Sequence, residues 1–142
     1  MSKIKVGSAL SLKIKYNNNE LAEFEHYYLV AEEIEGKKYK LFEIVQFDSI
    51  KDKNIKSRFD DSIFYIPIQS GTFIEKESYV DLKKEIRIEK YDELDKYLVE
   101  NNLSEELIND IISNYKEYHD THIITNDNKV SILKDELELI NK

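Results

Sequence analysis

Three polar residues that follow an apolar run are the first candidates for chemistry in this chain. The run is Ile63–Ile68, and Gln69, Ser70 and Thr72 come after it. An apolar, β-branched stretch that stops at small polar residues is typical of a buried strand that delivers side chains to a surface. We therefore expect an amide and two hydroxyls at a surface site. Simple turn formation is the alternative for Ser70, because a glycine follows it.

Histidines and arginines are few in this chain. The chain has three histidines, and its only arginines are Arg58 and Arg87. His26 opens the aromatic run of a predicted strand, and Arg87 lies between two isoleucines of another. A partly exposed strand histidine without a catalytic task, and an ordinary solvated arginine, are the alternatives for these two residues.

Two of the histidines have a spacing that permits metal binding. His119 and His122 are three positions apart, with Glu117 before them and Asp120 between them. On one helix such a pair can hold a metal ion. The pair also falls at an expected helix end, where histidine interacts favourably with the helix dipole. We prefer the second interpretation and predict no metal and no cofactor.

Composition indicates one compact domain over residues 1–142. Hydrophobic residues make up 41% of the chain and aromatic residues 11%, which is enough for a sizeable core. The absence of cysteine excludes disulfides, thiolate zinc sites and cysteine nucleophiles. We see neither a signal peptide nor an apolar run long enough to span a membrane, so the expected location is the cytoplasm.

Charge argues against a generally basic nucleic-acid-binding surface. The net charge is −8, and all but two of the 21 cationic side chains are lysines. Such a balance suits a protein that binds basic partners, or one that is merely soluble. A local basic groove in an acidic protein is still compatible with RNA as a ligand.

Hydrophobic periodicity places these candidates on strands followed by helices. Alternation predicts strands over residues 4–14, 24–34, 39–47, 63–68 and 78–89, with a loop tip at 17–19 and a long polar loop at 48–61. From Tyr91 the period becomes helical, Ser104 is a predicted N-cap, and residues 130–140 suggest a helix or a strand. The prediction is an α+β domain of about five strands (residues 1–90), curled into a small barrel, with C-terminal helices (residues 91–142).

On these elements the chain resembles the MazF/PemK family of toxin endoribonucleases, whose SH3-like barrel is shared with the CcdB toxins. The resemblance covers roughly Val6 to Tyr118, and the order and spacing of its pieces carry it. Four stretches line up with the family's strands and closing helix: residues 5–12, HYYLV at 26–30, YIPIQS at 65–70, and YVDL at 79–82 leading into Arg87-Ile88.

The resemblance implies a toxin-type protein with an SH3-like barrel. It would be a metal-independent endoribonuclease that cuts single-stranded RNA by in-line attack of the 2′-OH. It would also be held inactive by an antitoxin peptide and form a homodimer. A partner strand also follows from Pro67, because a proline inside an apolar strand favours an edge position.

The family uses an arginine after the first loop and a Thr or Ser after the proline strand, and this chain departs from that pattern. His26 stands where the arginine would be, and only Ser70 remains of the hydroxyl pair. Cleavage without a metal needs a base for the 2′-OH and a cation for the developing charge. By this resemblance we expect His26 as base or acid, Ser70 as a donor to a phosphate oxygen and Arg87 as the cation. The expected substrate-binding residues are Gln69, Tyr27 and Thr72.

A protein of the same fold without catalytic activity is the rival interpretation, as is an unrelated acidic inhibitor encoded by a phage or plasmid. The missing family arginine, the scarcity of arginine and the charge of −8 favour it. Dense carboxylates would present a phosphate-like face to a nucleic-acid-binding enzyme.

Overall fold

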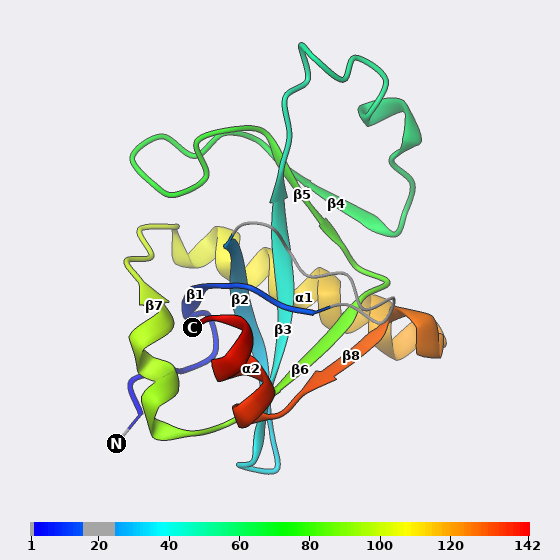
Figure 1. The fold of residues 1–142 in the computed structure, drawn as a ribbon. Helices are drawn as coiled ribbons and strands as arrows, with labels where there is room; N and C mark the ends of the chain where they lie inside the picture. The colour runs from blue at the N-terminus through cyan, green and yellow to red at the C-terminus, as the bar shows by residue number, and fades with distance from the viewer. Residues whose placement is uncertain (1, 16–24) are drawn as a thin grey trace.

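The computed structural model describes residues 2–15 and 25–142 (Figure 1). The loop tip predicted at residues 17–19 lies outside these ranges. The described residues form a curled, mainly antiparallel sheet with a long helix packed on one face, so an α+β domain with a barrel-like sheet is observed. No helix in the described ranges is long and apolar enough to cross a membrane.

The described part of the sheet has eight strands, not the five or so expected from alternation. Neighbours run in the order β4-β5-β3-β2-β1-β7, while β6 pairs with β3 and β8 pairs in parallel with β6. The strands are β1 (Ala9–Leu12), β2 (His26–Ile34), β3 (Lys38–Gln46), β4 (Ile63–Ile66), β5 (Ser78–Asp81), β6 (Glu85–Glu89), β7 (Leu98–Val99) and β8 (Lys129–Ile132). The helices are α1 (Glu105–Thr121) and α2 (Lys134–Ile140), with short 3₁₀ turns at Lys56–Arg58, Asp92–Tyr97 and Asn126–Asn128.

One predicted strand is broken in two by a turn. Residues 78–89 become β5 and β6, because Asp81 Oδ1 accepts a hydrogen bond from the backbone N–H of Lys83 at 3.1 Å. The backbone N–H of Lys84 also reaches the Asp81 carbonyl at 3.2 Å. As a result β5 pairs with the end of β3, and β6 pairs with its beginning.

The C-terminal part is less helical than expected. The stretch from Tyr91 forms only a 3₁₀ turn and then β7, which pairs with β1. Residues 130–140 contain both predicted alternatives, since β8 is followed directly by α2. The predicted N-cap is confirmed, because the Ser104 side chain accepts a hydrogen bond from the backbone N–H of Leu107 at 3.1 Å.

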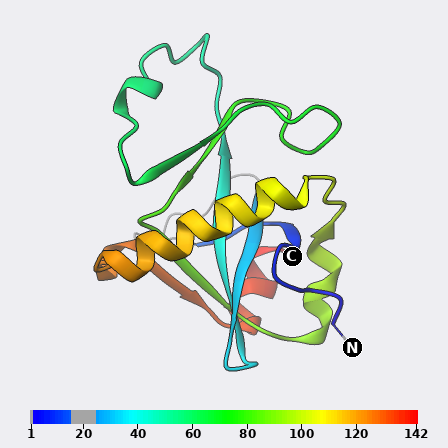
Figure 2. The same ribbon diagram turned by 180° about the vertical axis from the view of Figure 1, so that it is seen from behind.

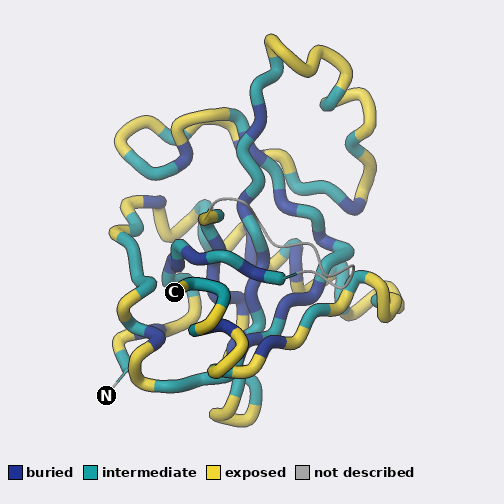
Figure 3. Tube along the Cα trace, viewed as in Figure 1, coloured by how far each residue is buried: buried dark blue, intermediate teal, exposed yellow. Residues whose placement is uncertain are grey.

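Two hydrophobic clusters lie on opposite faces of the sheet, as the alternation of their residues along β3 shows. Buried residues are spread along the strands of the sheet (Figure 3). The first fills the inside of the curl and includes Leu10, Tyr28 and Leu41. The second lies between the sheet and α1 and includes Phe42, Ile111 and Tyr115. Both clusters take side chains from β3, which agrees with the apolar residues that the sequence places on both of its faces.

Residues 47–81 extend from one end of the sheet as an outer lobe (Figure 1). Phe59 of the predicted long loop packs against Phe47 and Tyr79, with ring centroids 5.9 and 5.3 Å away. These contacts hold the loop on the β4–β5 hairpin. β4 ends the order of described strands, the edge position that Pro67 predicts.

Candidate functional site

An aromatic stack brings the loop after β4 to the start of β2. Tyr27 and Phe73 have ring centroids 4.5 Å apart and an interplanar angle of 28°. Gln46, at the end of β3, also donates from Nε2 to the Phe73 carbonyl at 3.2 Å. The sequence-predicted residues Tyr27, Gln69, Ser70 and Thr72 therefore lie on segments that meet at this end of the sheet. We call this region the loop end.

Two of the three predicted polar groups on this loop stabilise the loop itself. Gln69 Nε2 donates to the Pro67 carbonyl at 2.9 Å. Thr72 Oγ1 donates to the Gln69 carbonyl at 2.7 Å and accepts from the backbone N–H of Ile74 at 3.0 Å. Ser70 is exposed at the tip of the same turn. Its hydroxyl is consequently better placed to meet a ligand than the other two groups are.

His26 lies beside Tyr27 in the chain but points to the other face of β2. Its Nδ1 is 3.7 Å from Glu43 Oε2, and its side chain is 39% exposed. Glu43 is on β3, opposite Tyr28, and accepts from the Tyr28 hydroxyl at 3.4 Å. A histidine beside a carboxylate at a strand end is suited to proton transfer.

Arg87 does not join the loop end. It pairs across the strands with Lys40, whereas Tyr27 pairs with Ile44. Ile44 comes four positions after Lys40 on β3, which corresponds to about 13 Å at the usual rise of a strand. Arg87 therefore contributes to a different part of the same sheet face, near the C-terminal half of α1.

At that second position Arg87 belongs to a cluster of charged groups. Glu85 Oε1 lies 3.2 Å from both Arg87 Nη2 and Lys40 Nζ. The Glu85 side chain is only 9% exposed and that of Lys40 only 12%. Burial opposes ionisation of Glu85, but the hydrogen bond and charge of Lys40, together with those of Arg87, outweigh it and lower its pKa.

Helix α1 closes one side of this charged cluster with two ring side chains. The Tyr115 hydroxyl donates to the Lys84 carbonyl at 2.9 Å, and the His119 ring lies 4.1 Å from the Tyr115 ring. His119 Nε2 is 2.8 Å from the Leu82 carbonyl, so this nitrogen must carry the hydrogen. Nδ1 of the neutral ring is then a buried acceptor that has no hydrogen-bond partner.

The two histidines considered as a metal-binding pair make separate contacts. His119 faces the sheet, as described above. His122 stacks on Tyr118 at 3.9 Å, and its Nδ1 lies 3.1 Å from the Tyr118 carbonyl. Their rings are thus occupied with separate partners at the end of α1.

We expect the protonation of His119 to destabilise the fold. Burial, and then the charge of Lys40, lower its pKa below the ordinary value of 6.5. The unfolded chain therefore binds this proton more readily, so the stabilisation is complete above about pH 6.5 and is lost as the pH falls through the lower pKa of the folded state. Urea unfolding from pH 7.5 down to pH 5 should show a smaller loss of stability for His119→Gln than for the wild type.

The matched control for this measurement is His122→Gln, at an exposed position on the same helix end. This variant should retain the wild-type dependence of stability on pH. The same dependence in His119→Gln as in the wild type would contradict the role assigned to His119.

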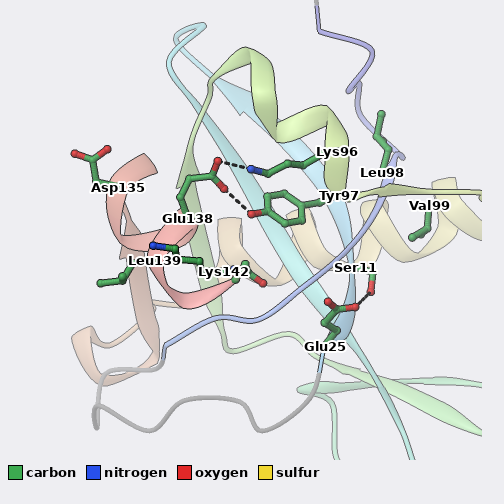
Figure 4. Close-up of a pocket in the computed structure, with 11 residues that line it drawn as sticks. Ser11, Glu25, Lys96, Tyr97, Leu98, Val99, Asp135, Glu138, Leu139 and Lys142 are labelled. Atoms are coloured by element: carbon green, nitrogen blue, oxygen red, sulfur yellow. Dashed lines mark hydrogen bonds and ion pairs between the residues drawn. The ribbon is translucent and has the colours of Figure 1, made fainter.

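A separate pocket of about 880 Å³ lies between β1, the 3₁₀ turn at Asp92–Tyr97 and α2 (Figure 4). Glu138 accepts a hydrogen bond from the Tyr97 hydroxyl at 2.5 Å and is paired with Lys96. Ser11 donates to Glu25 at 3.3 Å on the opposite wall. The pocket contains none of the predicted site residues, and Glu138 joins α2 to the 3₁₀ turn at Asp92–Tyr97.

Sequence reasoning missed the pairing of Arg87 with Glu85, and it also missed Lys40, Tyr115 and His119 as members of the surrounding cluster. A signal for one of them was present, because Lys40 lies between Tyr39 and Leu41 in a run with apolar residues on both faces. Compared with protein-family models and with characterised proteins, the chain gives no match.

Proposed function

We propose that this protein is a PemK/MazF-like toxin-type protein that binds single-stranded RNA at the loop end and cleaves it without a metal. The Tyr27–Phe73 stack is the observation that carries the proposal, because it brings the loop bearing Ser70 to the end of the strand that begins with His26, whose side chain lies on the opposite face of β2 from Tyr27. Aromatic rings at a strand end offer a surface on which an RNA base can stack. The barrel-like sheet is compatible with the resemblance seen in the sequence.

The proposed reaction is transfer of the phosphodiester to the neighbouring ribose oxygen. His26 accepts the proton of the 2′-OH, the 2′-oxygen bonds to phosphorus, and the bond to the 5′-oxygen breaks. Water protonates the leaving oxygen, and the products are a 2′,3′-cyclic phosphate and a 5′-hydroxyl end. Glu43 holds the imidazole in place, and the Ser70 hydroxyl donates to a phosphate oxygen. Arg87 has no part in this step.

We expect His26→Ala and Ser70→Ala to reduce cleavage of a fluorescent single-stranded RNA. Loss of a positioned acid–base group typically lowers a rate by about 10²–10⁴-fold, and His26→Ala should fall in that range. Ser70→Ala should have a smaller effect, because a hydroxyl that only donates a hydrogen bond carries no proton in the reaction. Fragment release is measured with EDTA present, and His122→Ala is the control.

If both variants cleaved RNA at the wild-type rate, His26 and Ser70 would not be the residues of the site. A wild-type protein that leaves RNA intact, in the tube and after expression in growing bacteria, would remove the proposed activity.

One observation favours a second candidate, a protein of this type that binds another protein and has no catalysis. The arginine expected as the cation, Arg87, lies away from the loop end and is paired with Glu85. The pocket beside α2 carries Glu25, Asp135 and Glu138, which suit a basic segment of a partner. Intact RNA together with binding of a lysine-rich peptide that is lost in Glu25→Gln would support this candidate.

A further inference from the structure

Cationic side chains gather on one part of the sheet face that also packs against α1. Residues directly opposite each other on neighbouring strands share a face. Lys40 is opposite Arg87 on β6, and Lys38 precedes Lys40 by two residues on β3. Lys129 of β8 is opposite Glu85 of β6, so its side chain lies on the same face of the sheet. We call Lys38, Lys40, Arg87 and Lys129 the cationic strip.

The carboxylates on this face are largely engaged. Glu85 is paired with two cations of the strip at once. Glu89 accepts a hydrogen bond from the backbone N–H of Lys134, at the start of α2, at 2.7 Å. Glu32, opposite Lys40, is the exposed acid beside the strip. The four cations therefore outnumber the acids of this face, although the whole chain has a net charge of −8.

Part of the strip is open to solvent, whereas Lys40 is largely buried. Figure 2 shows α1 crossing the sheet diagonally, with the lower ends of β3, β6 and β8 beyond it and no helix in front of them. The Arg87 side chain is 39% exposed, and Lys129 is exposed. Lys38 Nζ lies 3.4 Å from the hydroxyl of exposed Ser131, so a hydroxyl donor adjoins the cations.

Lys40 and Arg87 are like charges directly opposite each other, and one carboxylate, Glu85, is shared between them. Arg87 Nε is a buried donor with no hydrogen-bond partner. An anion placed against the exposed part of the Arg87 guanidinium would add a second negative charge beside these two cations and accept from N–H groups at its edge.

We propose that the cationic strip binds the phosphate backbone of single-stranded RNA. The extended row of cations over three strands matches a chain of phosphates better than it matches a single small anion. The identity of the ligand rests on the proposed function, whereas the surface does not depend on cleavage at the loop end. Contacts of this kind hold the chain without reading its sequence.

The test uses the full chain carrying His26→Ala, a labelled single-stranded RNA and fluorescence anisotropy at several salt concentrations. Each phosphate contact contributes about −0.7 to the slope of log K against log salt for a single strand. Lys38→Gln/Lys129→Gln should weaken binding and make the slope shallower by about 1.4. The control is Lys116→Gln, at an exposed position on α1, which should retain the slope.

The two arginines provide a second matched pair. Arg58 is also exposed and bonded to a carboxylate, Asp52, but it lies in the outer lobe. Arg87→Gln should weaken RNA binding while Arg58→Gln does not, with folding of both verified by urea unfolding. Unchanged binding in the lysine double variant and in Arg87→Gln would overturn the proposal.

Other ligands give distinguishable results. Binding of polyglutamate or of duplex RNA as tight as that of the single strand would overturn the RNA backbone as the ligand. A wild-type protein that binds RNA through the strip but does not cleave it would contradict the proposed cleavage at the loop end and support the strip as a binding surface. The same strip substitutions made without His26→Ala would support the strip if cleavage at low salt persists while binding at high salt becomes weak.

Discussion

Replacing Tyr115 by alanine is expected to lower the free energy of unfolding by about 3–5 kcal/mol, the usual cost of removing a buried aromatic ring. The ring is buried between α1 and the sheet and lies 5.2 Å from the Phe42 ring and 4.1 Å from the His119 ring. Its hydroxyl also fastens the helix to the turn between β5 and β6 through the Lys84 carbonyl. The substitution therefore removes packing and a tertiary hydrogen bond together.

Tyr115→Phe separates these two contributions. It keeps the ring and removes only the hydroxyl, so a loss of about 1 kcal/mol is expected. Urea unfolding followed by circular dichroism measures both variants. If Tyr115→Ala lost no more than Tyr115→Phe, the packing of α1 on this face would not be the source of its stability.

Glu85→Gln is expected to destabilise the protein by about 3 kcal/mol. That figure is at the lower end of the range seen when one partner of a buried ion pair is removed, because Arg87 keeps part of its side chain in water. The variant leaves Lys40 and Arg87 facing each other across β3 and β6 without the carboxylate between them. A double-mutant cycle with Lys40→Met measures the coupling, since the second substitution removes the repulsion.

The pH dependence provides an independent test of Glu85. Its pKa in the folded protein is lowered from 4.5, so its contribution is complete above that value and is lost as the pH falls through the folded pKa. The difference in stability between wild type and Glu85→Gln should accordingly shrink below about pH 4.5. A difference that stays constant down to pH 3 would show that the charge of Glu85 is not what stabilises this cluster.

The strands were largely predictable because their side chains alternate. The residues of β2, β3 and β4 lie mainly in predicted runs, and the Ser104 N-cap follows from a local hydrogen bond. The segment after Tyr91 was not predictable in the same way. Its apolar spacing fits a helix, but β7 exists through pairing with β1, a contact between distant parts of the chain.

The candidate site shows the same division between local and distant information. That Gln69, Ser70 and Thr72 end a strand can be read from neighbouring residues. That Phe73 stacks on Tyr27, and that Arg87 meets Lys40 and Glu85, depends on the register between strands. A one-residue shift in register would move Arg87 to the other face, and single-sequence patterns do not fix that register.

The division of one edge of β3 between two strands has a consequence for how the molecule opens. β5 is bonded to the last residues of β3, and β6 is bonded to its first four, so the outer lobe and the curled sheet share one strand. Amide hydrogens of the lobe can exchange with solvent by release of β5 alone, while those near Leu41 remain protected by β2 and β6. We therefore expect two levels of local stability in the described structure, with the boundary between them within β3.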